Sequence, residues 1–260
     1  MFSKPLLKQT IKSNFKLFAI ITVILCILIT IIMGVFDPKM INDIKDKSNG
    51  TINPLGDMST LIAFIANQFY GMMAIIFPMI YLIITGNKLI AGQVDKGSMA
   101  YNLSTPNTRT QITATSALYL TGSLVVMFGL IALVGSVVAA IVQPDILNYN
   151  TFLMLTLGGF LLQFAISGIT FLCSCIFNNS SKSLTIGAGL PLMFFAFNIM
   201  SGMSDKLGFL KNFSLITLFD SNAIIDGKGY AAKLIILAVL GIILYIAGIK
   251  IFKEKDLPLL

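Results

Sequence analysis

The sequence predicts an all-α integral membrane protein with six transmembrane helices. Three observations support this fold class. The chain of 260 residues is 56% hydrophobic and 11% charged, with a mean hydropathy of +0.90, whereas soluble domains carry about 25% charged residues. Several apolar runs are long enough to cross a hydrocarbon core of roughly 30 Å as helices. No ten-residue alternating pattern occurs, so a β-barrel is not expected.

Six apolar runs are interpreted as membrane spans. They cover residues 17–36, 61–85, 114–142, 152–177, 183–201 and 230–252. The third run is longer than one crossing needs and is expected to tilt or project, and the fifth contains Pro191. The chain has no internal repeat and no soluble block, so residues 1–260 are predicted to form a single transmembrane domain.

The segment before the first span has a regular four-residue spacing. One series of side chains is basic and the other is apolar: Lys4, Lys8, Lys12 and Lys16, and Leu7, Ile11 and Phe15. Residues four apart share a helix face, so the pattern predicts a helix lying in the membrane interface with snorkelling lysines. The alternative is a basic flank that only orients the first span.

Charge placement predicts the topology. The N-terminal segment, the connections between spans two and three and between four and five, and the C-terminal end together hold 11 of the 18 basic residues and 3 of the 11 acids. The positive-inside rule therefore places both termini in the cytoplasm. Basic residues are dispersed among the spans, so the net charge of +7 indicates orientation and attraction to membrane lipids, and a nucleic-acid partner is not expected.

The outer connections differ in polarity. Residues 37–60 are polar and are expected to be solvated, whereas residues 202–229 contain the apolar runs 207–210 and 213–219. These runs are too apolar for a free loop and too short to span, which predicts a short re-entrant or interfacial element before the sixth span.

Several kinds of chemistry have no sequence support. The chain has no histidine, which removes Ser–His proteases and His-based zinc sites, and it has no P-loop motif for ATP. Every acid lies outside the predicted spans, which disfavours an ion-coupled carrier. The chain is therefore not expected to be an enzyme or to hold a cofactor or metal, and energy for transport would come from a partner.

Neutral polar side chains lie within the spans. They are Asn67 and Gln68 with nearby Tyr70, Gln163, and Asn198. Such groups need partners in lipid, so they either form interhelical hydrogen bonds or line a substrate path. Pro78 and Pro191 are predicted to kink the second and fifth spans. The three cysteines fall within spans and are expected to be buried thiols.

The polar stretch between spans two and three predicts a short cytoplasmic helix. Gly97 and Pro106 delimit a helix of about residues 98–103, and Asn107 or Thr108 is placed to cap the following helix. From these residues alone, the stretch is either a simple connection or a surface that receives another protein.

Here the chain resembles the permease subunits of type-2 ABC transporters, which are mostly exporters. Their corresponding loop has acidic residues, then Gly-Thr/Ser, a Leu-rich turn and Pro-x-Ser/Thr-Arg. Residues 95–98, 103–106 and 107–109 of this chain are similar to that pattern, with departures at Gln93 and at Ala100-Tyr101. The basic N-terminal helix, the six spans and the apolar segment before the sixth span are also similar to the family, so the resemblance covers nearly the whole chain.

The resemblance implies a function and a set of site residues. The loop would be the coupling helix, which docks on a P-loop ATPase subunit that is present in two copies and carries ATP and Mg. The docking residues would be Asp95, Lys96, Gly97, Ser98, Tyr101, Leu103, Pro106 and Arg109. A second permease copy, identical or paralogous, would complete the transporter, and Asn67, Gln68, Tyr70 and Asn198 would be candidates for the translocation path.

The resemblance also implies export of a peptide, drug, toxin or lipid. One Arg against seventeen Lys, with abundant Ile and Asn, indicates an AT-rich bacterial genome, so the expected location is the bacterial cell membrane. Two other functions remain open. In the first, the chain is a membrane scaffold or a sensor's membrane partner and transports nothing. In the second, it is a channel or carrier that works without an ATPase.

Overall fold

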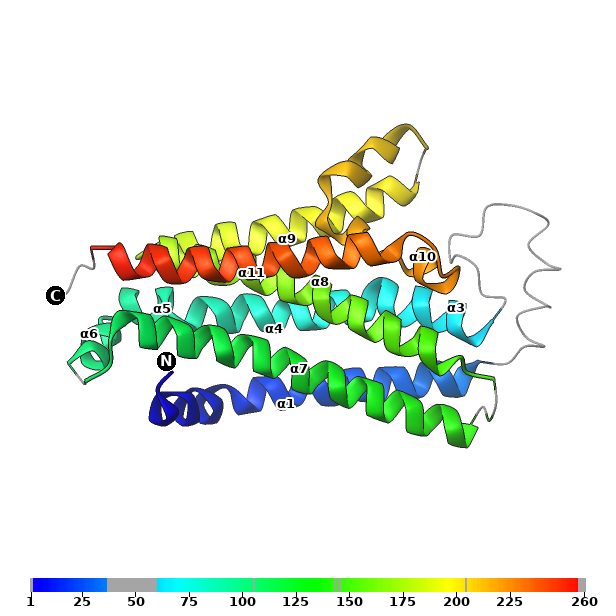
Figure 1. The fold of residues 1–260 in the computed structure, drawn as a ribbon, viewed down its shortest axis with the longest axis horizontal. Helices are drawn as coiled ribbons and strands as arrows, with labels where there is room; N and C mark the ends of the chain where they lie inside the picture. The colour runs from blue at the N-terminus through cyan, green and yellow to red at the C-terminus, as the bar shows by residue number, and fades with distance from the viewer. Residues whose placement is uncertain are drawn as a thin grey trace.

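The computed structural model describes residues 2–36, 60–104, 106–142, 144, 146–203 and 205–256. Within these ranges the regular structure is helical, and six helical segments are long and apolar enough to cross a membrane. They form an elongated bundle (Figure 1). The all-α fold with six candidate transmembrane helices, predicted from the sequence, is therefore confirmed.

The spanning segments follow the predicted order. They are α1 (Lys4–Val35), the composite of α3 (Leu61–Ile65), the π-helix η1 (Ala66–Met73) and α4 (Ala74–Leu89), then α7 (Arg109–Val142), α8 (Tyr149–Ile176), α9 (Ser180–Met203) and α11 (Tyr230–Glu254). The shorter elements are α5 (Ala91–Asp95), α6 (Ser98–Leu103), the 3₁₀ turns η2 (Asp205–Phe213) and η3 (Leu215–Leu218), and α10 (Ser221–Ile225).

The first and third spanning helices extend beyond the predicted apolar runs. α7 begins at Arg109, five residues before the predicted third span. α1 includes the lysine-rich segment without a break, and Figure 1 shows its first turns nearly end-on while the rest of the helix runs along the bundle. The interfacial placement of these first turns stays a prediction.

The second span is the most irregular. A π-helix occupies Ala66–Met73, which the sequence did not predict, and Pro78 lies inside α4. Proline has no N–H to donate to the carbonyl four residues earlier, here that of Ala74. Gln163 of α8 fills this role, because its Nε2 donates to the carbonyls of Ala74 (3.1 Å) and Ile75 (2.8 Å). Interhelical hydrogen bonding is therefore confirmed for this buried amide.

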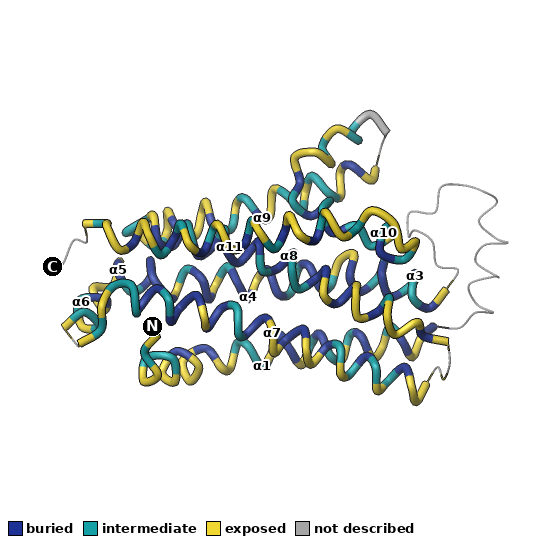
Figure 2. The backbone as a smooth tube through the Cα atoms, in the orientation of Figure 1, coloured by how far each residue is buried: buried dark blue, intermediate teal, exposed yellow. Residues whose placement is uncertain are grey.

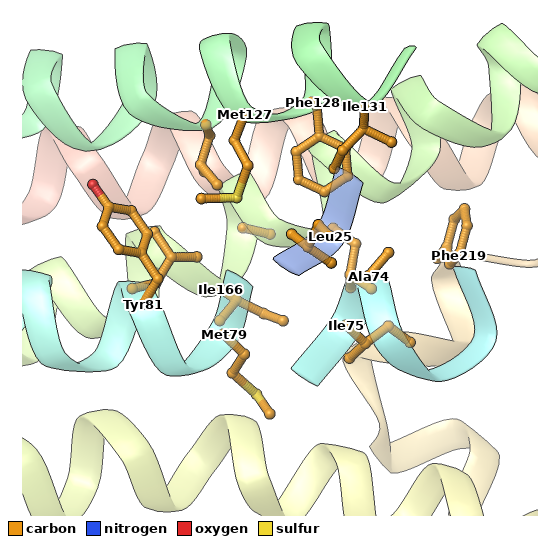
Figure 3. Close-up of a cluster of buried hydrophobic side chains, with 14 of the residues drawn as sticks. Leu25, Ala74, Ile75, Met79, Tyr81, Met127, Phe128, Ile131, Ile166 and Phe219 are labelled. Atoms are coloured by element: carbon orange, nitrogen blue, oxygen red, sulfur yellow. The ribbon is translucent and has the colours of Figure 1, made fainter. Parts of the chain in front are cut away.

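The core is centred on α8. In its most apolar window 67% of the residues are buried, compared with 17% for α9, and buried positions concentrate on the inner faces of the bundle (Figure 2). Figure 3 shows side chains from different helices, such as Leu25 of α1, Phe128 of α7 and Ile166 of α8, meeting there. α11 approaches α8 closely at Gly241, where an added Cβ would lie 2.5 Å from the Phe164 ring.

The segment between α9 and α11 is folded into η2, η3 and α10. In Figure 1 the end of α9 and η2 project away from the remaining helices. Phe209 and Phe213 of η2 are exposed, whereas Phe219 and Ile224 are buried against the bundle. The depth of this segment in a membrane is not established by the fold, so the re-entrant element before the sixth span stays a prediction. The polar outer connection predicted over residues 37–60 lies outside the described residues except for residue 60.

Candidate functional site

One end of the bundle gathers the start of α1, the elements α5 and α6, the turn between α8 and α9, and the end of α11. Figure 1 shows these elements together at the left, while α3 and α10 lie at the right. The predicted helix over residues 98–103 is present as α6. The predicted docking residues therefore belong to one continuous structure at this end.

The link from α5 to α6 is built by local hydrogen bonds. Gly97 has φ +71°, a left-handed conformation that glycine adopts without steric cost. Ser98 Oγ donates to the carbonyl of Gln93 (3.2 Å), and Asn102 Nδ2 donates to Gln93 Oε1 (2.7 Å). Gln93 therefore holds α6 against α5, so the two short helices form a single unit.

The predicted docking residues differ in their exposure. Tyr101 is 78% exposed, whereas Met99 is 2% exposed and anchors α6 to the core. Leu103 is partly buried against the core. The remaining exposed members of the set are Asp95, Lys96, Gly97, Ser98 and Pro106. α6 thus presents a protruding aromatic ring with exposed charges on the preceding turn.

Arg109 is occupied within the chain. It is the first residue of α7 and its Nη1 donates to the backbone carbonyl of Lys255 (2.6 Å). The start of α7 is fixed by a reciprocal cap in which Thr108 Oγ1 accepts from the N–H of Gln111 and Gln111 Oε1 accepts from the N–H of Thr108. Thr108, one of the two predicted capping residues, therefore serves as the cap.

Lys255 ties the chain end to α8. Its Nζ donates to the carbonyl of Cys175 (3.0 Å), near the C-terminus of α8. A lysine suits this place because the last carbonyls of a helix lack intrahelical donors and carry partial negative charge. Burial of the ammonium lowers the pKa of Lys255 below its ordinary value. Arg109, Lys255 and Cys175 thus connect the ends of α7, α11 and α8.

A second connection joins the α5–α6 unit to α8. α4 and α5 are separated at Ile90, whose φ and ψ are −128° and −70°. A continuous helix would bond the N–H of Ala91 to the carbonyl of Asn87. The buried hydroxyl of Ser174 replaces that bond, since it accepts from the Ala91 N–H (2.9 Å) and donates to the Asn87 carbonyl (3.4 Å).

Two more contacts reach the turn between α8 and α9. Asn87 Nδ2 donates to Ser180 Oγ (2.7 Å), and Asn179 Nδ2 donates to Asp95 Oδ1 at 3.4 Å. Together with Ser174, these side chains link each part of the α4–α5 junction to the end of α8 and the start of α9. We call Asn87, Asp95, Ser174, Asn179 and Ser180 the junction contacts.

A polar cavity of about 460 Å³ lies beside the junction, between the first turns of α1, the α4–α6 region and the start of α9. Its lining includes Gln9, Asn87, Gln93 and Lys96. Lys88 spans one wall, donating from Nζ to the carbonyl and Oγ of Ser13 and to Asn14 Oδ1. The start of α1 is therefore held to the end of α4.

Three of the four predicted path residues lie on η1 and the fourth lies on α9. Asn67 and Gln68 are in η1, and Asn198 is half-buried in α9. Tyr70 has no exposed surface, shares a hydrogen bond with Thr156 of α8, and packs against the Phe152 and Phe219 rings. η1 packs against α1, α8 and α10, whereas α9 packs against α4, α8 and η2. A role for these four residues in a path stays a prediction.

Several residues of this region had no distinguishing sequence signal. Ser174 is a small hydroxyl residue between two cysteines in an apolar run, and Asn87 sits in an ordinary span end. Only the packing of α8 against α4 gives them a role. In the described part of the chain, no group of three or more His, Cys, Asp or Glu side chains could hold a metal ion.

A family model described as ABC-2 family transporter protein matches residues 7–257. This chain belongs to the ABC-2 transporter family. The match spans nearly every helix described above, which confirms the resemblance found in the sequence. As a family member the chain is a multi-pass membrane subunit of a transporter, and permeases of the ABC-2 family generally work with an ATPase subunit. A comparison with curated proteins found no match.

Proposed function

We propose that this ABC-2 family member is the permease subunit of an ATP-driven exporter in a bacterial cell membrane. Two copies of a separate P-loop ATPase would bind ATP and Mg, and both termini of the permease would face the cytoplasm. The observation that carries the proposal is the α5–α6 unit, which displays Tyr101 at the end of the bundle and is joined to the spans by the junction contacts.

The docking role falls mainly on Tyr101 and the charged turn before α6. Exposed aromatic side chains are frequent anchors in protein interfaces because they bury a large apolar area on contact. Tyr101 protrudes from its own chain and so keeps most of its ring area free for a partner, while Asp95 and Lys96 lie exposed on the preceding turn. Arg109 would act indirectly, since its guanidinium holds the C-terminal segment.

Movement of the α5–α6 unit would pass to α8 and α9 as well as to α4 and α7. The helix is interrupted at Ile90, between α4 and the α5–α6 unit. Ser174 of α8 accepts a hydrogen bond from the Ala91 N–H at this interruption. Side chains inserted into a helix ladder mark places where helices bend. Gln163 of α8 occupies the gap near Pro78, so side chains of α8 fill the breaks at both Pro78 and Ile90.

The proposed substrate class and second copy rest on surface chemistry. The spans carry neutral and apolar side chains, which suits an amphipathic peptide, drug, toxin or lipid. A second permease copy, identical or paralogous, would pack on α9, which is the least buried span and exposes Leu192, Met193 and Ile199.

The test is co-purification of tagged protein from its native membrane in mild detergent. We expect a P-loop ATPase of separate sequence in about equal amount. Tyr101→Ala should weaken its retention, since loss of an interface anchor costs about 2 kcal/mol or roughly 30-fold in affinity. Tyr149→Ala is the matched control, because Tyr149 is also exposed but begins α8 at the opposite end of the bundle.

Two outcomes would contradict the proposal. Absence of any ATPase after cross-linking of the wild type would favour a scaffold or a stand-alone carrier. Equal retention of the ATPase by the Tyr101→Ala and wild-type proteins would show that α6 is not the docking element.

A further inference from the structure

An apolar groove runs between the first turns of α1 and the cytoplasmic-end half of α7. Its volume is about 390 Å³, within the range of small-molecule pockets. The walls include Leu7, Ile11 and Phe15 of α1 and Leu118, Gly122 and Val126 of α7. We call it the α1–α7 groove.

The groove is open because Gly122, at the middle of the α7 wall, has no side chain to fill it. A Cβ added at Gly122 would meet nothing within 4 Å. The apolar walls are open, with Phe15 58% exposed and Val126 52% exposed. In the part of the chain that the structure describes, no side chain fills this space, so another apolar group must cover it in a membrane.

The charges around the groove have one sign. Lys8, Lys12 and Lys16 each follow a groove-lining residue by one position and are exposed, so they form a ridge beside the groove. Neither α1 nor α7 contains an acidic residue. The base of α4, Lys88, is bonded to Ser13 and Asn14 of α1 and is not in the groove lining. An occupant with an apolar chain and a negative head fits this surface.

We propose that the α1–α7 groove binds an anionic phospholipid. One acyl chain lies between the α1 and α7 walls, and the headgroup phosphate contacts the lysine ridge formed by Lys8, Lys12 and Lys16. The binding holds the first turns of α1 at the membrane surface. This inference is independent of the ATPase, so it stands or falls separately from the proposed export function.

The absence of tryptophan from the sequence allows a clean reporter. Phe15→Trp places a single indole in the groove. Leu133→Trp is the matched control, because Leu133 lies on α7 outside the groove lining and is 60% exposed. Each full-length protein is placed in vesicles that contain brominated phosphatidylglycerol or, at the same mole fraction, brominated phosphatidylcholine, and the quenching of tryptophan fluorescence is compared.

We expect the groove reporter to be quenched more by the anionic lipid and the control reporter equally by both lipids. A lysine near an anionic surface contributes a roughly fivefold preference. Replacing Lys8, Lys12 and Lys16 with Gln in the Phe15→Trp protein should therefore bring the two quenching curves together.

A second pair of variants, made in the Phe15→Trp protein, tests the groove itself. Gly122→Leu fills the space and should reduce quenching of the groove reporter by the anionic lipid. Gly129→Leu should leave that quenching unchanged, because a Cβ there also meets nothing but the position lies outside the groove. Equal quenching of the groove reporter by both lipids would overturn the proposal in favour of unselective boundary lipid. Resistance to both lipids would overturn it in favour of a protein occupant.

Discussion

The hydroxyl of Ser174 in α8 replaces a backbone hydrogen bond that is missing where α4 ends and α5 begins. It accepts the Ala91 N–H and donates to the Asn87 carbonyl, the two groups that a continuous helix would have joined. Serine suits this place because a hydroxyl is both donor and acceptor. A buried N–H without a partner costs about 1–3 kcal/mol, so the break at Ile90 depends on this side chain.

We predict that Ser174→Ala lowers stability by about 1–3 kcal/mol, because the buried Ala91 N–H loses its acceptor. A thiol-reactive dye that fluoresces on unfolding can measure this, since Cys173 and Cys175 are buried in the native chain. Ser116→Ala is the control, because that buried hydroxyl donates to the Ile112 carbonyl of its own helix. Equal melting temperatures for the two variants would contradict the proposed bridge.

Asp220 links the segment before α11 to its first turns. Partial burial acts to raise the pKa of its carboxyl, but hydrogen bonds from Lys233 Nζ (2.8 Å) and the Ala223 N–H (3.1 Å) outweigh it and hold the pKa below its ordinary value. A depressed carboxyl pKa stabilises the fold above the unfolded-state pKa, and the contribution is lost as pH falls through the folded-state value.

We therefore predict that acidification from about pH 6 to about pH 3 lowers the melting temperature more in the wild type than in Asp220→Asn. Asparagine keeps a capping oxygen for α10 but has no charge to titrate. The comparison isolates this one carboxyl, because all other acids are shared by both proteins. Parallel pH curves would show that the pair with Lys233 contributes nothing to stability.

At the scale of elements, α8 compensates for defects in the second span. Pro78 deprives the Ala74 carbonyl of its helical donor, and Gln163 supplies a replacement from α8. The gap at Pro78 thus has a partner across the interface, which makes the two helices dependent on each other there. This dependence can be measured as a coupling energy between two substitutions.

We predict that Gln163→Leu destabilises the protein and that adding Pro78→Ala recovers part of the loss. Alanine at position 78 restores an N–H for the Ala74 carbonyl, so the double variant should be more stable than the sum of single effects by about 0.5–3 kcal/mol. Thermal unfolding of the four proteins in the cycle gives the value. Strict additivity would mean that Gln163 does not serve the gap left by Pro78.

At the scale of the whole molecule, the bundle has two different ends. The first turns of α1, α6 and the end of α11 lie at one end, and α10 lies at the other (Figure 1). An even number of spans requires both termini on one side of the membrane. The lysines in the first turns of α1 and around the end of α11 predict that this side faces the cytoplasm.

We predict that Lys4→Cys and Lys253→Cys are labelled by an impermeant maleimide only from the cytoplasmic side, and Asp226→Cys only from outside. All three positions are exposed. The experiment uses a background with the three native cysteines, which lie in spanning helices, replaced by alanine. Labelling of Lys253→Cys from outside in intact cells would overturn the topology.

Local patterns in the chain were enough to establish the fold class, the number and order of spans, the α6 helix and the family. The fold class, the spans and α6 follow from apolar runs of membrane length and from Gly97 and Pro106. The family resemblance follows from the loop pattern together with the order of the basic N-terminal helix, the six spans and the apolar segment before the sixth span. Packing in three dimensions was needed for the π-helix at residues 66–73, the roles of Ser174 and Gln163, and the engagement of Arg109 by Lys255. The roles of these side chains arise because residues distant in sequence satisfy backbone groups that a broken or ended helix leaves unpaired, and no local pattern encodes which distant residue will do so.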